Sequence, residues 1–320
     1  MALILISVSF LAIAFVSLKL YLTLKCKWCM SKICLVGKTV IITGANSGIG
    51  YEAALEIAKR GARVILACRN EDKAVQARDS IIRETGNSNV TFGLIDFSSL
   101  ESIRQFAKQI LANEKRLDIL INNAGVGFLR DKMTVDGLQV LMQVNYFGPV
   151  LLTMLLLDLL KKSAPSRIIN VSSLLAKKAN LTVENLNKYP GKIKNYNNSK
   201  LGNILFTMKL AELLKNSDVS LFSVHPGVID TNIFRKIQGF RKIILDFVKT
   251  VYFKTPEEGA QTILFTALEP GLEIYTGGHF DECALRETYE TAKDPILMES
   301  IWKKTMELLN LEVDQLLSSS

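Results

Sequence analysis

Histidine is scarce in this chain of 320 residues, which contains only His225 and His279. Two imidazoles are too few for a histidine-rich metal site. Their scarcity also argues against a Ser-His-Asp hydrolase, which needs a histidine as its general base. A hydrophobic fraction of 48% and a charged fraction of 22% are typical of a chain with a large folded core.

Cysteine is also sparse, and its pattern excludes two further classes. The five cysteines are odd in number and widely scattered, which argues against a disulfide framework: Cys26, Cys29, Cys34, Cys68 and Cys283. The first two have the spacing of a metal-binding pair, but no second pair follows. We therefore predict neither a disulfide-stabilised fold nor a metal site.

Acidic residues are outnumbered, 31 to 39, by lysine and arginine, which gives a net charge of +8. The basic residues are spread along the chain and form no cluster with aromatic residues, so nucleic acid is not the predicted partner. A basic surface beside anionic lipid or an anionic cofactor fits this charge better.

Charge is absent from residues 1–18, and the apolar run continues after Lys19 to Leu24. A helix needs about 20 apolar residues to cross a bilayer. A cleaved signal peptide is the alternative, but neither a basic segment before the run nor a small-x-small cleavage site supports it. We predict a membrane anchor at 1–24, a basic linker at 25–36, and a cytosolic domain after it.

From residue 38 onward, short apolar runs alternate with amphipathic segments, which indicates βαβ units and a parallel sheet. The pattern predicts an α/β fold: a Rossmann-type, doubly wound parallel sheet of about seven strands in one domain, residues 37–285. A helical C-terminal extension is expected at 286–320. Strands are predicted at 38–43, 63–68, 90–95, 117–121, 167–171, 219–224 and 273–276.

A glycine-rich turn joins the first predicted strand to the first helix of this domain. Glycine tolerates the backbone angles of a tight turn, and it lets backbone N–H groups approach a pyrophosphate at the helix start. The strand before the turn and the helix after it make the motif specific. The candidate cofactor-binding residues of this turn are Gly44, Asn46, Ser47, Gly48, Ile49 and Gly50.

Arg69 follows the second predicted strand, about where an NAD-binding unit would place an acidic residue for the ribose. An arginine there can pair with the 2′-phosphate of NADP, although a plain surface arginine is the alternative. Asp96 follows the third strand, where it would contact the adenine or simply form a turn. Asn123, Ala124 and Gly125 follow the fourth strand and would line the cofactor ribose or make an ordinary turn.

Tyr196 and Lys200 form a Tyr-x-x-x-Lys pentad on one face of a predicted helix, and Ser173 follows the predicted strand at 167–171. A free tyrosine, with a pKa of about 10, is a poor acid at neutral pH. A nearby ammonium and an oxidised nicotinamide would favour the phenolate and lower that pKa. Ser173 would hold the substrate oxygen beside the phenol, so Ser173 and Tyr196 are the substrate-binding candidates.

Together these motifs resemble the short-chain dehydrogenase/reductase family, over about residues 37–280. Within it they look like the microsomal retinol dehydrogenases that use NADP(H). The resemblance implies that Tyr196 is the acid/base and that Lys200 binds the nicotinamide ribose and tunes Tyr196. It also implies that Ser173 polarises the carbonyl. Asn145 matches the family's proton-relay asparagine, and the nicotinamide contacts fall on Pro226, Gly227 and Thr231.

The resemblance implies an NADPH-dependent oxidoreductase that interconverts a lipophilic aldehyde or ketone and its alcohol, with retinal and retinol first. A steroid or fatty aldehyde is the alternative substrate, and a non-catalytic lipid-droplet surface protein is the alternative role. The expected location is the endoplasmic reticulum membrane, with the lipid droplet as its rival. Family members often pair through the helix that carries Tyr196, which leaves a homodimer open. One departure is Gly148-Pro-Val150, where the retinol-active group usually has Gly-His-Phe, and the proline is expected to disturb a helix near the substrate.

Overall fold

The computed structural model describes residues 17, 26–127, 129–229 and 253–312. The predicted anchor at 1–24, apart from Ser17, and the predicted cofactor residue Thr231 lie outside these residues. Within the described ranges, no helix is long and apolar enough to cross a membrane.

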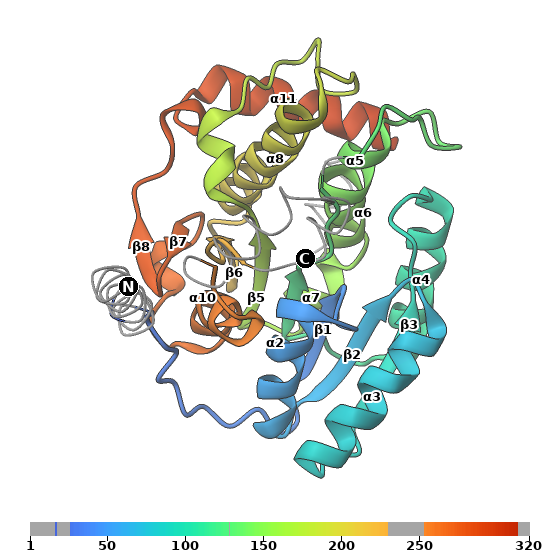
Figure 1. Cartoon of the computed structure of the whole chain (residues 1–320), viewed down its shortest axis with the longest axis vertical. Coiled ribbons are helices and arrows are strands. Elements are labelled where there is room, and N and C mark those ends of the chain that lie inside the picture. The colour runs from blue at the N-terminus through green and yellow to red at the C-terminus, as the bar shows by residue number, and fades with distance from the viewer. Residues whose placement is uncertain (1–16, 18–25, 128, 230–252, 313–320) are drawn as a thin grey trace, which may run out of the picture.

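The described chain builds one sheet of eight strands in the order β3-β2-β1-β4-β5-β6-β7-β8 (Figure 1). All neighbouring strands are parallel except β7 and β8, which are antiparallel. This confirms the predicted α/β fold and adds a strand to the predicted count. The strands are β1 (Thr39–Thr43), β2 (Arg63–Cys68), β3 (Val90–Leu94), β4 (Ile119–Asn122), β5 (Ser166–Val171), β6 (Val219–His225), β7 (His279–Asp281) and β8 (Ala284–Arg286).

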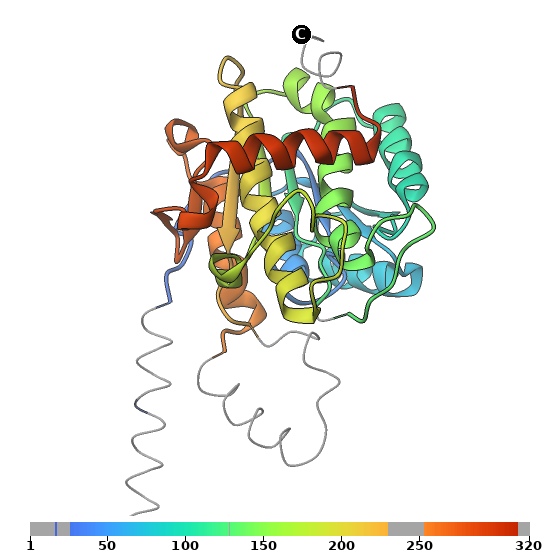
Figure 2. The same cartoon turned by 90° about the horizontal axis from the view of Figure 1, so that it is seen from above.

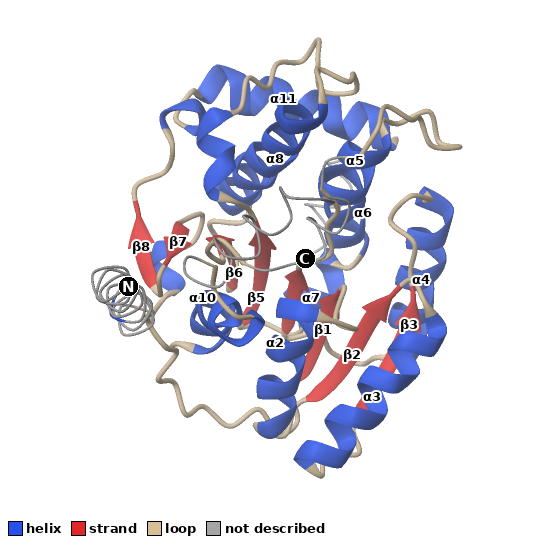
Figure 3. Ribbon diagram, in the orientation of Figure 1, coloured by secondary structure: helices blue, strands red, loops and turns tan. Residues whose placement is uncertain are grey.

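Helices cover both faces of the sheet (Figure 3). One core packs α2 (Gly48–Lys59), α3 (Glu71–Thr85) and α10 (Pro256–Leu268) against the sheet. The other core contains α4 (Leu100–Asn113), α6 (Gly148–Leu155), α7 (Leu157–Lys162), α8 (Lys192–Leu213) and α11 (Pro295–Leu309). Within β1, Val40 and Ile42 join the first core and Ile41 joins the second, because successive strand side chains point to opposite faces.

The predicted strand at 273–276 is wrong. Glu273–Tyr275 forms the 3₁₀ turn η4, whose backbone bonds are local, for example from the Tyr275 N–H to the Leu272 carbonyl at 2.8 Å. Ile274 is 79% exposed, so this segment has no buried face to hold it in the sheet. The strands that follow, β7 and β8, are joined by Glu282 and Cys283, both with φ of +50°. Such hairpin turns normally carry Asn-Gly or Gly-Gly, so the sequence lacked the usual signal.

The predicted long helix before β5 is divided into several pieces. It starts as α5 (Val140–Met142), continues as the π-helical turn η1 (Gln143–Phe147), and is interrupted again between α6 and α7 at Leu156. Pro149 lies in the first turn of α6, directly after the π turn. Proline has no N–H to donate, and in the π turn before it the regular i→i−4 hydrogen-bond ladder is already interrupted. The irregularity expected from Pro149 thus coincides with the junction between η1 and α6.

The predicted extension at 286–320 is part of the folded body as far as the structure describes it. Strand β8 crosses the predicted boundary, and α11 packs across α8, with the Trp302 and Phe206 rings stacked at 5.9 Å. The Tyr146 hydroxyl in η1 is hydrogen-bonded to the Thr305 hydroxyl of α11 at 2.8 Å, fully buried. Helix α11 therefore supports the π turn that contains Asn145.

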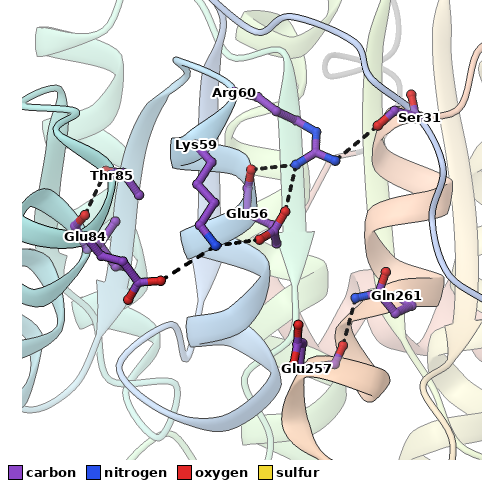
Figure 4. A network of polar contacts seen from close by, with 9 residues as sticks. Ser31, Glu56, Lys59, Arg60, Glu84, Thr85, Glu257 and Gln261 are labelled. Atoms are coloured by element: carbon purple, nitrogen blue, oxygen red, sulfur yellow. Dashed lines mark hydrogen bonds and ion pairs between the residues drawn. The ribbon is translucent and has the colours of Figure 1, made fainter. Parts of the chain in front are cut away.

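The described part of the linker predicted at 25–36 is tied to two helices, and Figure 4 shows its contact with the first of them, α2. The Arg60 guanidinium, at the end of α2, donates to the Ser31 carbonyl at 3.1 Å and to Glu56 at 3.0 Å. The Cys29 N–H donates to the side chain of Gln261 in α10 at 3.1 Å. This segment is therefore a strap that is held along its length, and it leads back to β1.

We expect Thr305→Val to lower the free energy of unfolding by about 1–3 kcal/mol, because it leaves the buried Tyr146 hydroxyl without its partner. The double variant Tyr146→Phe/Thr305→Val should recover part of this loss, since both polar groups are then removed. Urea unfolding of the two single variants and the double variant checks this. Additive losses would show that the hydrogen bond does not connect α11 to η1.

Candidate active site

A cavity of about 690 Å³ lies at the carboxyl ends of the parallel strands. It includes the point between β1 and β4 where the strand order reverses, which is where open α/β sheets bind ligands. Fifteen of the residues predicted for the site line it: Gly44, Asn46, Ser47, Gly48, Ile49, Arg69, Asp96, Asn123, Ala124, Gly125, Ser173, Tyr196, Lys200, Pro226 and Gly227. Gly50 and Asn145 lie behind its wall, and Thr231 lies outside the described residues.

The start of α2 is open to an anion. Ser47 is its N-cap residue, yet the serine side chain makes no capping hydrogen bond, and the first turn contains no acidic residue. The first N–H groups of the helix, with the positive end of its dipole, therefore face the cavity without a side-chain acceptor.

Gly50 has a packing role in this turn rather than a contact with the cavity. A Cβ at this position would lie 2.5 Å from the Asn123 amide nitrogen and 2.7 Å from the Gly44 carbonyl. Only glycine lets α2 start this close to β1 and β4, which is the role of the third glycine in a dinucleotide-binding turn.

The segment after β4 is fastened to the end of β1 by Thr43. The Thr43 hydroxyl accepts hydrogen bonds from the N–H groups of Asn123 at 3.0 Å and Ala124 at 2.9 Å. The Asn123 side chain donates to the Thr43 carbonyl at 2.9 Å. These bonds leave Ala124 and Gly125 to form the cavity wall. Sequence reasoning missed Thr43, although its place at the end of β1 was a usable signal.

Arg69 and Asp96 end neighbouring strands at one side of the cavity. Arg69 is exposed and follows β2 directly. Asp96 accepts hydrogen bonds on one carboxylate oxygen from the Ser98 N–H at 2.9 Å and the Ser98 hydroxyl at 2.7 Å. Asp96 thus forms a turn and also lines the cavity, and its contact with the adenine stays a prediction.

Ser173, Tyr196 and Lys200 meet at the other end of the cavity. The Ser173 and Tyr196 side chains are hydrogen-bonded, and the Lys200 ammonium lies 5.8 Å from the centre of the Tyr196 ring. Lys200 is buried and donates to the Val171 carbonyl at 3.0 Å. Ser172, by contrast, is buried with its hydroxyl bonded to the Lys200 carbonyl at 2.8 Å, so it supports α8 instead of facing the cavity with its hydroxyl.

Burial controls the protonation of both titratable groups. It raises the pKa of Tyr196, and the hydrogen bond with Ser173 opposes that rise. It lowers the pKa of Lys200 from 10.5 to about 8. The chain by itself therefore keeps Tyr196 protonated at neutral pH, which suits a proton donor.

Asn145 holds the cavity wall from behind. Its side-chain oxygen accepts from the Val126 N–H, and its side-chain nitrogen donates to the Val126 carbonyl, both at 2.8 Å. The same nitrogen donates to the Ser199 hydroxyl at 3.2 Å. Asn145 therefore joins η1, the segment after β4 and α8 just before Lys200. π-Helical turns often mark functional sites.

His225 is a cavity residue that sequence reasoning did not include. Its Nδ1 atom accepts a hydrogen bond from the Leu174 N–H at 3.2 Å. Burial, reinforced by the charge of Lys254, lowers the pKa of His225 to about 4, so the ring is neutral and can accept this bond. His225 directly precedes the predicted site residues Pro226 and Gly227, and this position could have indicated its role.

Comparison with known proteins shows the family to which this chain belongs. The model of the short chain dehydrogenase family matches residues 38–242. Retinol dehydrogenase 11 from Mus musculus is 45% identical over 288 residues, which cover 89% of this chain and 90% of the relative. Retinol dehydrogenase 12 from Bos taurus is 41% identical, with 88% and 90% covered. This chain belongs to the short chain dehydrogenase family and is an oxidoreductase.

Solved structures share the fold. A crystal structure of an uncharacterized protein from Mycobacterium paratuberculosis has a TM-score of 0.72 at 28% identity, covering 89% of this chain and 98% of that one. A short chain dehydrogenase from Escherichia coli CFT073, complexed with NADPH, has a TM-score of 0.61 at 28% identity, covering 78% and 97%.

We expect Lys200→Met to stabilise the ligand-free chain at pH 7 by on the order of 1–3 kcal/mol, because a charged lysine is costly to bury. The pKa of Lys200 is lower in the folded chain than in the unfolded chain. Between pH 8 and 10.5 the unfolded chain therefore binds more protons at this lysine than the folded chain does. The wild type therefore gains stability over this window, and the advantage of the variant shrinks. Urea unfolding at pH 7 and pH 10 measures the difference.

Lys108→Met, on the exposed side of α4, is the control for removal of a positive charge. A Lys200→Met variant that is less stable than the wild type at pH 7, or whose difference from it does not change with pH, would contradict the burial cost.

Proposed function

We propose that this protein is a membrane-anchored, NADP(H)-dependent reductase that interconverts a lipophilic aldehyde or ketone and its alcohol, with retinal as the first substrate. The observation that carries the proposal is one cavity with two ends. At one end are the open start of α2 and Arg69, and at the other are Ser173, Tyr196 and Lys200.

The residues present fit a phosphorylated dinucleotide. The uncapped start of α2 suits a pyrophosphate, since its N–H groups have no side-chain acceptor. Arg69 stands at the end of β2 as a cation for the 2′-phosphate, and the residue after β2 is not acidic. Two similar short chain dehydrogenases have been solved in complex with NADP or NADPH, which supports the same choice here.

When bound, the reduced cofactor would supply a hydride to the carbonyl carbon. Ser173 would donate a hydrogen bond to the carbonyl oxygen and so favour the negative charge that develops there. Tyr196, protonated at neutral pH, would give its phenolic proton to that oxygen. Lys200 would hold the nicotinamide ribose, and its charge would stabilise the phenolate that remains. Asn145 would keep the cavity wall near Lys200 in place. It would also support the transfer of a new proton to Tyr196.

The substrate proposal rests on the wall beside Tyr196 and on the relatives. Apolar side chains surround the catalytic end of the cavity: Val126, Val144, Leu174, Leu175 and Val228. A long apolar carbonyl compound fits such a wall better than a sugar, and the similar curated proteins include three kinds of retinol dehydrogenase. The apolar run at 1–24 would hold the enzyme at the endoplasmic reticulum membrane, where a retinoid dissolves.

Tyr196→Phe is expected to lower kcat for the reduction of retinal with NADPH by about 10²–10⁴-fold, because the proton donor is lost. Tyr275→Phe, at an exposed tyrosine of η4, is the matched control and should keep the wild-type rate. Retinol formed by purified, reconstituted enzyme is the readout. Near wild-type activity of Tyr196→Phe would remove Tyr196 from the chemistry.

Arg69→Ala is expected to raise KM for NADPH by about 10–100-fold and to leave KM for NADH nearly unchanged, because only NADPH carries the 2′-phosphate. Arg78→Ala, on α3, is the control for loss of a nearby arginine. Steady-state kinetics with both cofactors checks the prediction. If the ratio of the two KM values does not change, the phosphate is bound elsewhere.

A further inference from the structure

The strap begins at Cys26, which lies close to a lysine that packs against the cavity wall. Cys26 is buried, and the nearby ammonium group of Lys254 opposes the rise that burial causes in the pKa of its thiol. Lys254 is fixed there by an ion pair with Glu282 at 2.6 Å. Residues 1–24, which precede this point, contain a single charge, Lys19. A long apolar segment therefore joins the folded body at this place.

Lys254 also packs against two residues of the cavity wall. Its backbone N–H donates to the Val228 carbonyl at 2.8 Å, and its side chain packs on Gly227, where a Cβ would lie 2.6 Å from the lysine Cδ. Gly227 and Val228 line the cavity. The Lys254 side chain thus lies between Cys26, where the strap begins, and the cavity wall.

The surface around Leu174 and the start of α8 is both apolar and strongly basic. Leu174, which lines the cavity, is 37% exposed, and Ile193, one turn before Tyr196, is 62% exposed. Exposed lysines flank them: Lys177, Lys178, Lys192 and Lys194. Residues 174–194 contain five lysines and one acidic residue, Glu184. Figure 2 shows the start of α8, the turn η2 (Leu174–Lys178) and the start of the strap on the same side of the molecule.

We propose that this surface, the basic rim (Leu174, Lys177, Lys178, Lys192, Ile193 and Lys194), rests on the anionic face of a lipid bilayer. The mouth of the cavity then opens toward the lipid, and the carbonyl substrate enters from the bilayer rather than from water. The inference deepens the proposed function, because it needs the anchored chain and the lipophilic substrate.

Two independent features favour a bilayer as the occupant of this surface. Exposed leucine and isoleucine among lysines are the composition that lies in a membrane interface, with apolar side chains inserted and ammonium groups at lipid phosphates. Residues 1–24 precede Cys26, and the strap starts on the same side of the molecule as α8 (Figure 2), so a bilayer that holds the apolar run lies near the basic rim. A soluble acidic protein would match the charge but would give no reason for the apolar segment to join here.

The first experiment uses the full-length enzyme in phosphatidylcholine vesicles, with or without about 30% phosphatidylserine. The rim variant is Lys177→Glu/Lys178→Glu/Lys192→Glu/Lys194→Glu. The matched control is Lys108→Glu/Lys115→Glu/Lys162→Glu/Lys215→Glu, four exposed lysines, three of which precede β4, β5 and β6 at the other end of the sheet. Both variants change the net charge equally.

In anionic vesicles we expect KM for bilayer-dissolved retinal to rise at least about 10-fold in the rim variant and to change little in the control. A short, water-soluble aldehyde should be reduced equally by both. High salt should raise KM for retinal in the wild type, since it screens the contact. Equal KM values of rim variant and control in anionic vesicles would overturn the proposal, and a difference confined to crude microsomes would assign the rim to a protein partner instead.

A second measurement does not depend on activity, so it separates the rim from the proposed function. In a Cys34→Ser background, an environment-sensitive fluorophore is attached to Ile193→Cys or to Ile296→Cys, two exposed isoleucines in α8 and α11. Lipid-borne quenchers should quench the probe at 193 and spare the probe at 296. Equal quenching at the two positions would refute the docking even if the enzyme reduces retinal.

Discussion

The burial of Lys200 is the constraint on which the rest of the site depends. A lysine placed fully inside a protein loses hydration, and this loss lowers its pKa to about 8. The Val171 carbonyl at the end of β5 accepts a hydrogen bond from the Lys200 ammonium group. Asn203 donates to the same carbonyl at 3.1 Å. The ammonium group is thus held at the junction of β5 and α8, beside the tyrosine and serine that line the cavity.

Other parts of the structure keep that junction in one place. Asn145 ties the π turn to Val126 and to Ser199, and Tyr146 ties the same turn to α11. Gly202, two residues after Lys200, lies so close to the Tyr146 ring that a Cβ would be 2.8 Å from it. The C-terminal helix therefore supports, through one buried tyrosine, the two elements that hold Asn145 and Lys200.

Sequence could predict the features that depend on residues close together in the chain. The glycine turn, the tyrosine and lysine one helical turn apart, and the serine at a strand end each have a local pattern, and the structure brings them to one cavity. The parallel sheet followed from alternating apolar runs. The β7–β8 hairpin was missed because Glu282 and Cys283 adopt positive φ without the glycine or asparagine that usually signals it. The bond between Tyr146 and Thr305 joins residues 159 positions apart, and no local pattern reveals such a contact.

In the proposed function, one cavity brings a hydride source and a proton donor together. The most direct test is a single turnover of the full-length enzyme with retinal and NADPH that carries deuterium at the transferable position. The account predicts one deuterium in the retinol formed, at the former carbonyl carbon, with the wild type and only trace product with Tyr196→Phe. Retinol without deuterium, or equal labelled product from both proteins, would contradict it.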